Sequence, residues 1–592
     1  MIIRRDTTMR RHLYKGIIPV IFCLLLLLFF LVKVLNRTTF DDFSTDFFRH
    51  EVSQSKISLH YTLADPSAYE IEEAAASFGL LNEEEAAAEQ AWLRESAAEL
   101  REWLNRGLEE KDETTARVLL WWVEGQLETD DFYYYQEPLA PTLGVQAQLP
   151  VLLAEFPFRC REDIDIYLEL LGKLPEYFAE LAAFEREKSA LGLFMRDELL
   201  EQVFEQCRAL TEFYSSHYLV KSFQERLENC DFLTEDQRFT YEVKNQAALL
   251  DGLLPAYEQL SAELEALHGT GTNDCGLCCY EDGLSYYQYL LRYSVGTDRD
   301  LEDIETLLEE QIADDYETIL YAISEGENLL EEPTSDSSPA EILAALQEQI
   351  RTDFPESADI SWQIREVPAS LQDFLSPAFY LTPAIDAVEE NTIYINPSYE
   401  TTYVNMVTTL AHEGYPGHLY QHSFESALSP ARSVCEIGGY TEGWGLYSEL
   451  YAYDFLGLSE LKADALRALS SLNYAVCASL DLYIHSAGWT EADCADYLAA
   501  FGITDAEQLH SLYLNILAEP SNYMKYYLGY LEICELKESF LQLSPENSVY
   551  DFHKWFLETG PAPFSILNDL LDREEDISET SKIFSQLQKR AG

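Results

Sequence analysis

Two histidines and a glutamate of one short segment have the side chains that bind catalytic zinc. His412 and His418 lie six residues apart, and Glu413 directly follows the first of them. A catalytic zinc ion is held by about three side chains, commonly histidine and glutamate, and keeps one position open for water. Histidines four residues apart on a helix differ by roughly 40° around its axis, so both rings reach one ion. A spacing of six on a straight helix separates the rings by about 120°, so a straight helix cannot present both.

The residues between the two histidines include Pro416 and Gly417, which together interrupt a helix. Proline lacks an amide donor and clashes with the carbonyl four residues back, and glycine accepts the dihedral angles that a bulge requires. We therefore expect two residues to loop out at this pair and to return His418 to the face of His412. His422 lies four residues further on and is more typical of a core or solvent-facing position than of a ligand.

The third zinc ligand is expected on a second helix. Glu442 lies 24 residues after His418 and is the predicted ligand. Glu449 follows it by seven residues, on nearly the same helical face, where it would orient a ligand or compete for the metal. Glu413 is predicted to be the general base, which activates a zinc-bound water and passes the proton to the leaving nitrogen. The predicted cofactor is thus Zn²⁺, bound by His412, His418 and Glu442.

The metal segment resembles the signature of bacterial proteins catalogued as domain of unknown function 885. That family is similar in pattern to the helical gluzincins, which include Taq-type carboxypeptidases and angiotensin-converting enzyme. Residues 59–66 look like the family's opening motif, and residues 138–146 resemble another of its segments. Glu442-Gly443-Trp444 matches the Glu-Gly-Trp that supplies the family's third ligand. The resemblance implies a zincin-like, helical, two-lobed metallopeptidase fold.

The same resemblance implies two donors for the oxyanion that forms when an amide is hydrolysed. Histidine or tyrosine commonly serves this purpose beside the metal. The segment Asp481 to His485 is similar to an Asp-x-x-x-His of the family, so His485 is one candidate, with Asp481 orienting its ring. Residues 520–529 resemble a family segment with a tyrosine three residues before a glycine, which makes Tyr526 the other candidate. The neighbouring tyrosines 523 and 527 are alternatives.

The elements that would position these residues are mainly α-helical. Residues 83–108, 164–191 and 197–220 carry apolar residues at three- and four-residue spacing, which is typical of amphipathic helices. Residues 360–364 and 392–396 alternate between apolar and polar side chains and are rich in β-branched residues. This pattern predicts a small sheet beside the metal helix.

The chain is expected to form two parts that share one cleft. Residues 40–340 are the predicted helical N-terminal part, and residues 341–592 are the predicted zinc-binding catalytic part. Prolines and serines mark residues 331–340 as the loop between them.

The N-terminus predicts a membrane anchor. Residues 1–16 are basic, and residues 17–35 form an apolar run roughly long enough to span a bilayer. The basic cluster predicts a cytoplasmic N-terminus, a single-pass signal anchor and an extracellular catalytic part. Secretion after cleavage of a signal peptide is the alternative, and no small-x-small cleavage site follows the run.

Composition excludes one class of partner. Asp and Glu total 105 against 39 Lys and Arg, which gives a formal net charge of -66. Such a surface repels phosphate backbones, so we expect no nucleic-acid binding. Cys275, Cys278 and Cys279 lack a second ligand pair nearby, so a disulfide or plain thiols are favoured over a second zinc site.

These observations predict a zinc metallopeptidase that hydrolyses peptides outside the cytoplasmic membrane. Two alternatives are a zinc hydrolase of another amide or ester, and a catalytically silent binding scaffold. The sequence assigns no basic residue as a clamp for a substrate C-terminus, so endopeptidase and carboxypeptidase activity both remain open. It does not specify the oligomeric state.

Overall fold

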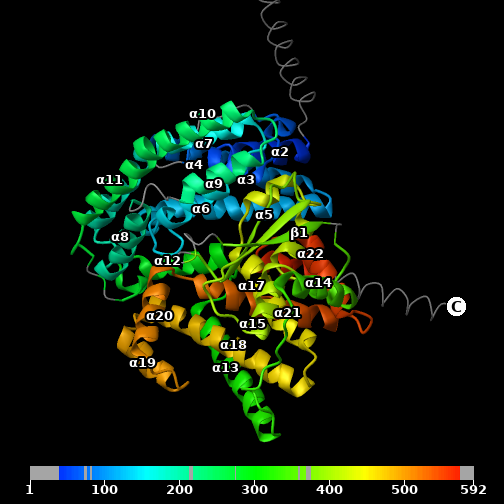
Figure 1. Cartoon of the computed structure of the whole chain (residues 1–592). Coiled ribbons are helices and arrows are strands. Elements are labelled where there is room, and N and C mark those ends of the chain that lie inside the picture. The colour runs from blue at the N-terminus through cyan, green and yellow to red at the C-terminus, as the bar shows by residue number, and fades with distance from the viewer. Residues whose placement is uncertain are drawn as a thin grey trace, which may run out of the picture.

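The fold is mainly α-helical, as predicted, with one small sheet (Figure 1). The computed structural model describes residues 39–573 except 72–76, 80–82, 212–217, 272, 274, 358–359, 368–371 and 373–374. Within those ranges no helix has both the length and the apolar character needed to cross a bilayer. The predicted anchor over residues 17–35 lies outside the described residues.

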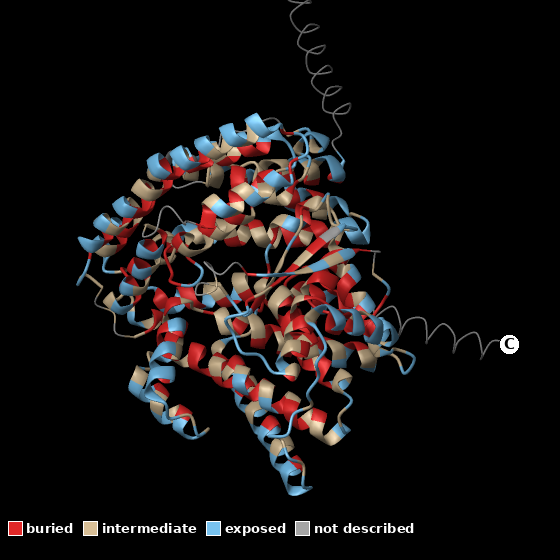
Figure 2. Cartoon of the chain, in the orientation of Figure 1, coloured by how far each residue is buried: buried red, intermediate tan, exposed pale blue. Residues whose placement is uncertain are grey.

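Most helices of the first half of the chain arch over the upper part of Figure 1, whereas the last of them, α13 (Leu301–Ser324), extends to the bottom of the view. The described α-helices here are α2 (Phe40–Val52), α3 (Lys56–Thr62), α4 (Glu83–Arg106), α5 (Glu110–Glu128), α6 (Val145–Glu155), α7 (Arg161–Leu191), α8 (Asp197–Thr211), α9 (Tyr218–Glu228), α10 (Glu235–Ala248), α11 (Leu254–Glu265), α12 (Gly283–Leu290) and α13 (Leu301–Ser324). Figure 2 shows the outward faces of α10 and α11 exposed and their inward faces buried, as amphipathic spacing requires. The predicted helix over 197–220 is divided between α8 and α9.

The second half of the chain supplies most of the lower part of Figure 1. Its described α-helices are α14 (Pro339–Gln349), α15 (Tyr403–Glu413), α16 (His418–Glu425), α17 (Gly438–Tyr451), α18 (Glu460–Leu482), α19 (Glu491–Ala499), α20 (Ala506–Ala518), α21 (Asn522–Leu543) and α22 (Val549–Thr559). Helix α14 begins at a capping box, in which Ser338 and Glu341 satisfy each other's backbone amides.

The sheet has three strands in the order β1-β3-β2. The predicted strands are confirmed as β1 (Ser361–Glu366) and β3 (Glu390–Ile395), which pair in parallel. The third strand, β2 (Ala378–Leu381), pairs antiparallel with β3 and was not predicted. Because β2 lies at the edge of the sheet, one side of its backbone is free of strand partners.

The two predicted parts are packed into each other. Each of the three hydrophobic cores contains residues from both sides of residue 340. One core, for example, joins Leu119 of α5 to Trp444 of α17. The chain is therefore not divided into two separate packing units at that residue.

The cysteine cluster forms a disulfide, as favoured by the sequence. Cys275 and Cys279 are bonded, and Cys278 is a free thiol. All three lie against Gly488, at the turn that ends the segment η10 (Tyr483–Ala487).

Candidate metal centre

The predicted interruption between the two histidines is present and has the predicted length. Helix α15 ends at Glu413 and α16 begins at His418, with a cis peptide bond between Tyr415 and Pro416. The amide of Gly417 donates to the carbonyl of Ala411 at 2.8 Å, six residues back. An α-helix makes this bond four residues back, so the loop contains two additional residues.

The interruption requires glycine at its second position. A Cβ atom on Gly417 would lie 1.8 Å from the carbonyl oxygen of His412, closer than any two such atoms approach. Trp444 of α17 fixes the loop from the other side, because its indole N–H donates to the carbonyl of Pro416 at 2.8 Å. The loop is thus held against the helix that carries the third predicted ligand.

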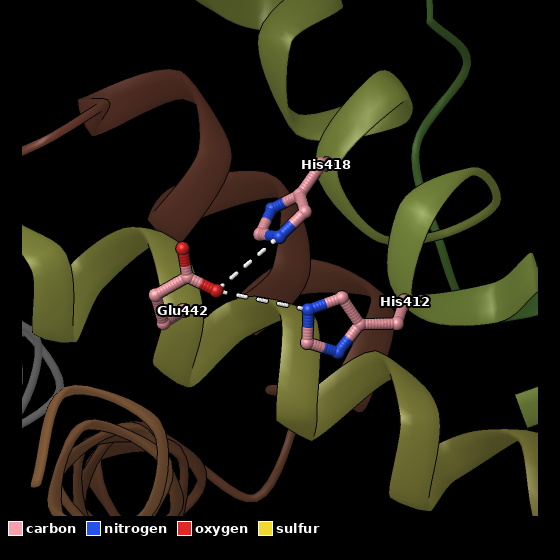
Figure 3. Close-up of side chains that lie close together, drawn as sticks. All are labelled: His412, His418 and Glu442. Atoms are coloured by element: carbon pink, nitrogen blue, oxygen red, sulfur yellow. Dashed lines mark ion pairs between the residues drawn. The ribbon is translucent and has the colours of Figure 1, made fainter. Parts of the chain in front are cut away.

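The three predicted metal ligands converge on one point (Figure 3). One carboxylate oxygen of Glu442, Oε2, lies 3.7 Å from Nε2 of His412 and 3.5 Å from Nε2 of His418. Four zinc bonds of about 2.0–2.1 Å in a tetrahedron would place the ligand atoms roughly 3.3 Å apart. The two separations that involve Glu442 are therefore close to those of a tetrahedral zinc site, and all three ligand atoms lie within 4.8 Å of one another.

Charge also favours a cation at this position. The carboxylates of Glu413, Glu442 and Glu449 surround the two imidazoles, and none of them pairs with a lysine or arginine among the described residues. Burial opposes the ionisation of Glu442, but His412 and His418 outweigh it and hold its pKa far below the usual range. Glu442 is therefore ionised, as a metal ligand must be.

Space for the two rings depends on a glycine that sequence reasoning did not single out. A Cβ atom on Gly445 would lie 2.6 Å from Nε2 of His412 and 2.9 Å from Cε1 of His418. Gly445 lies three residues after Glu442, so it presents a bare helix surface beside the ligand. The repeated glycines in Glu442-Gly443-Trp444-Gly445 were the available signal.

The predicted general base lies at the edge of the sheet. Oε2 of Glu413 accepts a hydrogen bond of 2.8 Å from the amide of Tyr380, in β2. Burial raises the pKa of Glu413, an effect that the two histidines partly offset. A carboxyl group with a raised pKa is better suited to take up and return a proton near neutral pH.

Glu449 lies on the far side of His412 from the ligand cluster. Its Oε2 lies 3.3 Å from Nδ1 of His412, but the two atoms are not aligned for a hydrogen bond. The same carboxylate oxygen accepts a hydrogen bond of 3.2 Å from the hydroxyl of Tyr474. Burial lowers the pKa of His412, but Glu442 and Glu449 outweigh it and raise the pKa well above the usual range. Glu449 therefore faces the ring nitrogen opposite the predicted ligand atom, which is the position of a carboxylate that orients a metal-binding histidine.

Tyr526 lies at the metal centre, as the resemblance implies. Its ring is 6.1 Å from that of His412, and burial, together with the charges of Glu442 and Glu413, raises the pKa of its hydroxyl well above the usual value. Helix α21 reaches this position because α17 and α21 pack backbone to backbone. A Cβ atom on Gly443 would lie only 2.4 Å from the carbonyl carbon of Gly529.

His485 does not belong to this cluster, which corrects its predicted role as an oxyanion donor. Its Nδ1 accepts from the amide of Leu277 at 3.2 Å, and its Nε2 lies 2.9 Å from the carbonyl of Ile516. Both ring nitrogens are thus engaged with the backbone. Asp481, expected to orient the ring, instead accepts from the hydroxyl of Tyr287 at 2.8 Å. His485 is a structural residue that links α12, α20 and the disulfide loop.

Comparison with known proteins establishes the family. The family model described as "Bacterial protein of unknown function (DUF885)" matches residues 71–571. The chain therefore belongs to this bacterial family. No curated protein matches it.

Two solved structures share the fold. The chain is similar to "the putative lipoprotein from Colwellia psychrerythraea" with a TM-score of 0.78 and 18% identity, over 91% of this chain and 99% of that one. It is also similar to "a putative lipoprotein of unknown function from Shewanella oneidensis", with a TM-score of 0.65 and 15% identity, over 90% of this chain and 100% of that one. At these identities the likeness concerns the fold alone.

Proposed function

We propose that the chain is a zinc-dependent metallopeptidase of gluzincin type. The observation that carries this proposal is the convergence of His412, His418 and Glu442 on one point, next to Glu413. Histidines and a glutamate at these separations suit zinc, and three protein ligands leave the open position of a catalytic site.

Each side chain has a defined task in this proposal. Zinc, when bound by His412, His418 and Glu442, supplies a Lewis acid that polarises the substrate carbonyl. Glu413 takes the proton of the attacking water and delivers it to the leaving nitrogen. The hydroxyl of Tyr526 donates a hydrogen bond to the oxyanion that develops on the substrate carbonyl.

The edge strand β2 supports a peptide as the substrate. The amide of Tyr380 points to Glu413 rather than to β3, so the free edge of β2 faces the metal centre. An extended peptide can add itself to such an edge through main-chain hydrogen bonds. A substrate held there would run past the general base.

We further propose that the chain acts outside the cytoplasmic membrane. The basic residues before the apolar run over residues 17–35 support this orientation. The two structures that share its fold carry the word lipoprotein in their descriptions, which fits an envelope location.

The test compares the wild-type chain with Glu413→Gln, both loaded with zinc, on a mixed peptide library read by mass spectrometry. Glu89→Gln is the matched control, since Glu89 also contacts a histidine, His50, away from this site. We expect cleavage by the wild type and the control, and a loss of roughly 10²- to 10⁴-fold in Glu413→Gln with its zinc retained. Zinc binding without cleavage of any peptide would reject the peptidase and leave a hydrolase of another bond or a silent scaffold.

A further inference from the structure

A cavity of about 670 Å³ adjoins the metal centre, and the ligand Glu442 lines it. Its walls also include Trp121 and Trp122 of α5, together with Tyr289 of α12 and Tyr293 of the segment η6 (Leu291–Val295). This volume lies within the range of small-ligand pockets, and aromatic walls give such pockets their affinity for apolar groups. The cavity is therefore large enough for the end of a substrate chain.

Lys525 is the one cation among the described residues that line this cavity. No carboxylate of the described residues forms an ion pair with it, although the chain has 105 acidic residues against 39 Lys and Arg. Asp481 and Glu519 lie near it, but burial raises the pKa of both carboxyl groups, and neither pairs with its ammonium group. Lys525 thus offers a positive charge that has no ion-pair partner among the described residues, beside the candidate metal centre.

Lys525 lies on α21 directly before Tyr526, whose ring is 6.1 Å from that of His412. Lys525 and the predicted ligand Glu442 line the same cavity. A substrate anion bound by Lys525 therefore lies in the cavity that borders the candidate metal centre.

We infer that Lys525 binds the C-terminal carboxylate of the peptide, which makes the enzyme a carboxypeptidase. This inference rests on the proposed peptidase function. A terminal carboxylate is the anion that every peptide carries next to its last peptide bond. The aromatic walls favour a large apolar residue at the C-terminus.

Binding tests the inference without requiring turnover. The probes are two N-acetylated peptides of one sequence, free of Asp and Glu and ending in phenylalanine, one with a free carboxyl group and one amidated. Titration calorimetry measures their Kd values with zinc-loaded Glu413→Gln chain. Since a hydrogen-bonded charge pair is involved, we expect the free acid to bind roughly 10- to 100-fold more tightly.

Variants of Lys525 show whether it causes the preference. In the Glu413→Gln background, Lys525→Met is expected to bring the two Kd values within about twofold, and Lys525→Arg is expected to keep the preference. Lys554→Met is the matched control, since Lys554 is exposed and paired with Glu558 at 3.9 Å. Unchanged zinc content and circular dichroism establish that each variant is folded, and Lys525→Gln replaces Lys525→Met if that variant fails this check. Equal binding of acid and amide, or a preference that survives in Lys525→Met, would overturn the inference.

Cleavage by the wild-type chain separates this inference from the proposed function. Release of C-terminal phenylalanine from the free acid alone supports both. Equal cleavage of acid and amide at internal bonds keeps the peptidase and overturns the carboxypeptidase. Lys525-dependent binding without cleavage of either peptide supports the carboxylate site and rejects the peptidase.

Discussion

In the described part of the chain, two groups of histidine and glutamate side chains are close enough to hold a cation. They differ in the distances between their nitrogen and oxygen atoms. His412, His418 and Glu442 form one group, and His50, Glu51 and Glu89 form the other. In the first, the imidazole nitrogens stand 3.5 and 3.7 Å from the shared carboxylate oxygen. In the second, Nε2 of His50 lies 2.8 Å from Oε2 of Glu89, a direct hydrogen bond.

Hydrogen bonds link two members of the second group, His50 and Glu89, whereas Oε1 of Glu51 has no hydrogen-bond partner among the described residues. The amide nitrogen of Gln54 lies 2.7 Å from Nε2 of His50 and 3.0 Å from Oε2 of Glu89, so a donor occupies the position that an ion would need. The ring of His50 also stacks on Trp92, with the centroids 3.7 Å apart. Similar residue types thus give a candidate metal centre in one place and a hydrogen-bonded network in the other, and the two differ in the spacing of the ligand atoms.

The largest expected difference is in zinc binding after loss of one histidine from each group. Loss of a residue that only supports a metal ligand weakens metal binding ~10- to 100-fold. His418→Ala removes a ligand itself, so it should weaken zinc binding by more than this and should abolish hydrolysis. His50→Ala should leave zinc affinity and hydrolysis unchanged. Competition with a chromophoric chelator measures both affinities. Equal losses of zinc affinity in the two variants would mean that both groups contribute to zinc binding.

A bulkier residue at Gly445 should act almost as strongly. Gly445→Ala puts a methyl group against the rings of His412 and His418, so we expect at least ~10-fold weaker zinc binding. Gly172→Ala in α7 is the matched control, because a Cβ atom there meets no atom within 4 Å. Alanine stabilises helix interiors by up to about 1 kcal/mol relative to glycine, so the zinc loss cannot come from the helix itself. Unchanged zinc binding in Gly445→Ala would refute the packing argument.

The orienting carboxylate should have a smaller effect. Glu449→Gln retains a hydrogen-bond acceptor for Tyr474 but removes the charge next to His412, so zinc affinity should fall roughly 10- to 100-fold. Glu89→Gln, which changes the equivalent partner of His50, should leave zinc affinity the same. If the two substitutions changed zinc affinity equally, Glu449 would have no greater influence on the metal than Glu89.

The last difference concerns stability rather than zinc binding, in its dependence on pH at the group of His50, Glu51 and Glu89. Burial, then the charge of Glu89, raises the pKa of Glu51 to about 8. The folded chain therefore keeps a proton that the unfolded chain loses above its ordinary value of 4.5, so stability falls as pH rises from 4.5 to 8. Glu51→Gln removes this fall, and its stability relative to wild type should increase with pH by at most about 1.4 kcal/mol per unit.

Denaturant unfolding of the zinc-loaded wild type and of zinc-loaded Glu51→Gln, from pH 5 to pH 8, measures this difference. A cation bound at this group would keep Glu51 ionised in the folded chain. The relative stability of the variant would then decrease with pH, which is the opposite sign and would show that the group holds a metal.

The sequence predicted which side chains meet at the candidate metal centre, because the chemistry of zinc restricts both residue types and spacing. His412, His418 and Glu442 lie together, and the two-residue loop at Pro416 and Gly417 follows from helix geometry. The helical class and two of the three strands also follow from local periodicity.

Contacts between distant segments were not predictable from local pattern. Strand β2 has four residues, and its amide at Tyr380 reaches Glu413 only through the tertiary fold. His485 was assigned by resemblance, but its hydrogen bonds to Leu277 and Ile516 come from segments 208 and 31 residues away. The cavity beside Lys525 likewise depends on how α5, α17 and α21 are packed.

X-ray absorption spectroscopy of the zinc-loaded chain shows directly which atoms bind the metal. We expect one zinc per chain with two imidazole nitrogens and carboxylate or water oxygens at about 2.0–2.2 Å. The spectrum of His50→Ala should be the same, and that of His418→Ala should lose the two-imidazole signature. A sulfur shell at about 2.3 Å, or failure of the folded wild-type chain to bind stoichiometric zinc, would contradict the metal centre on His412, His418 and Glu442.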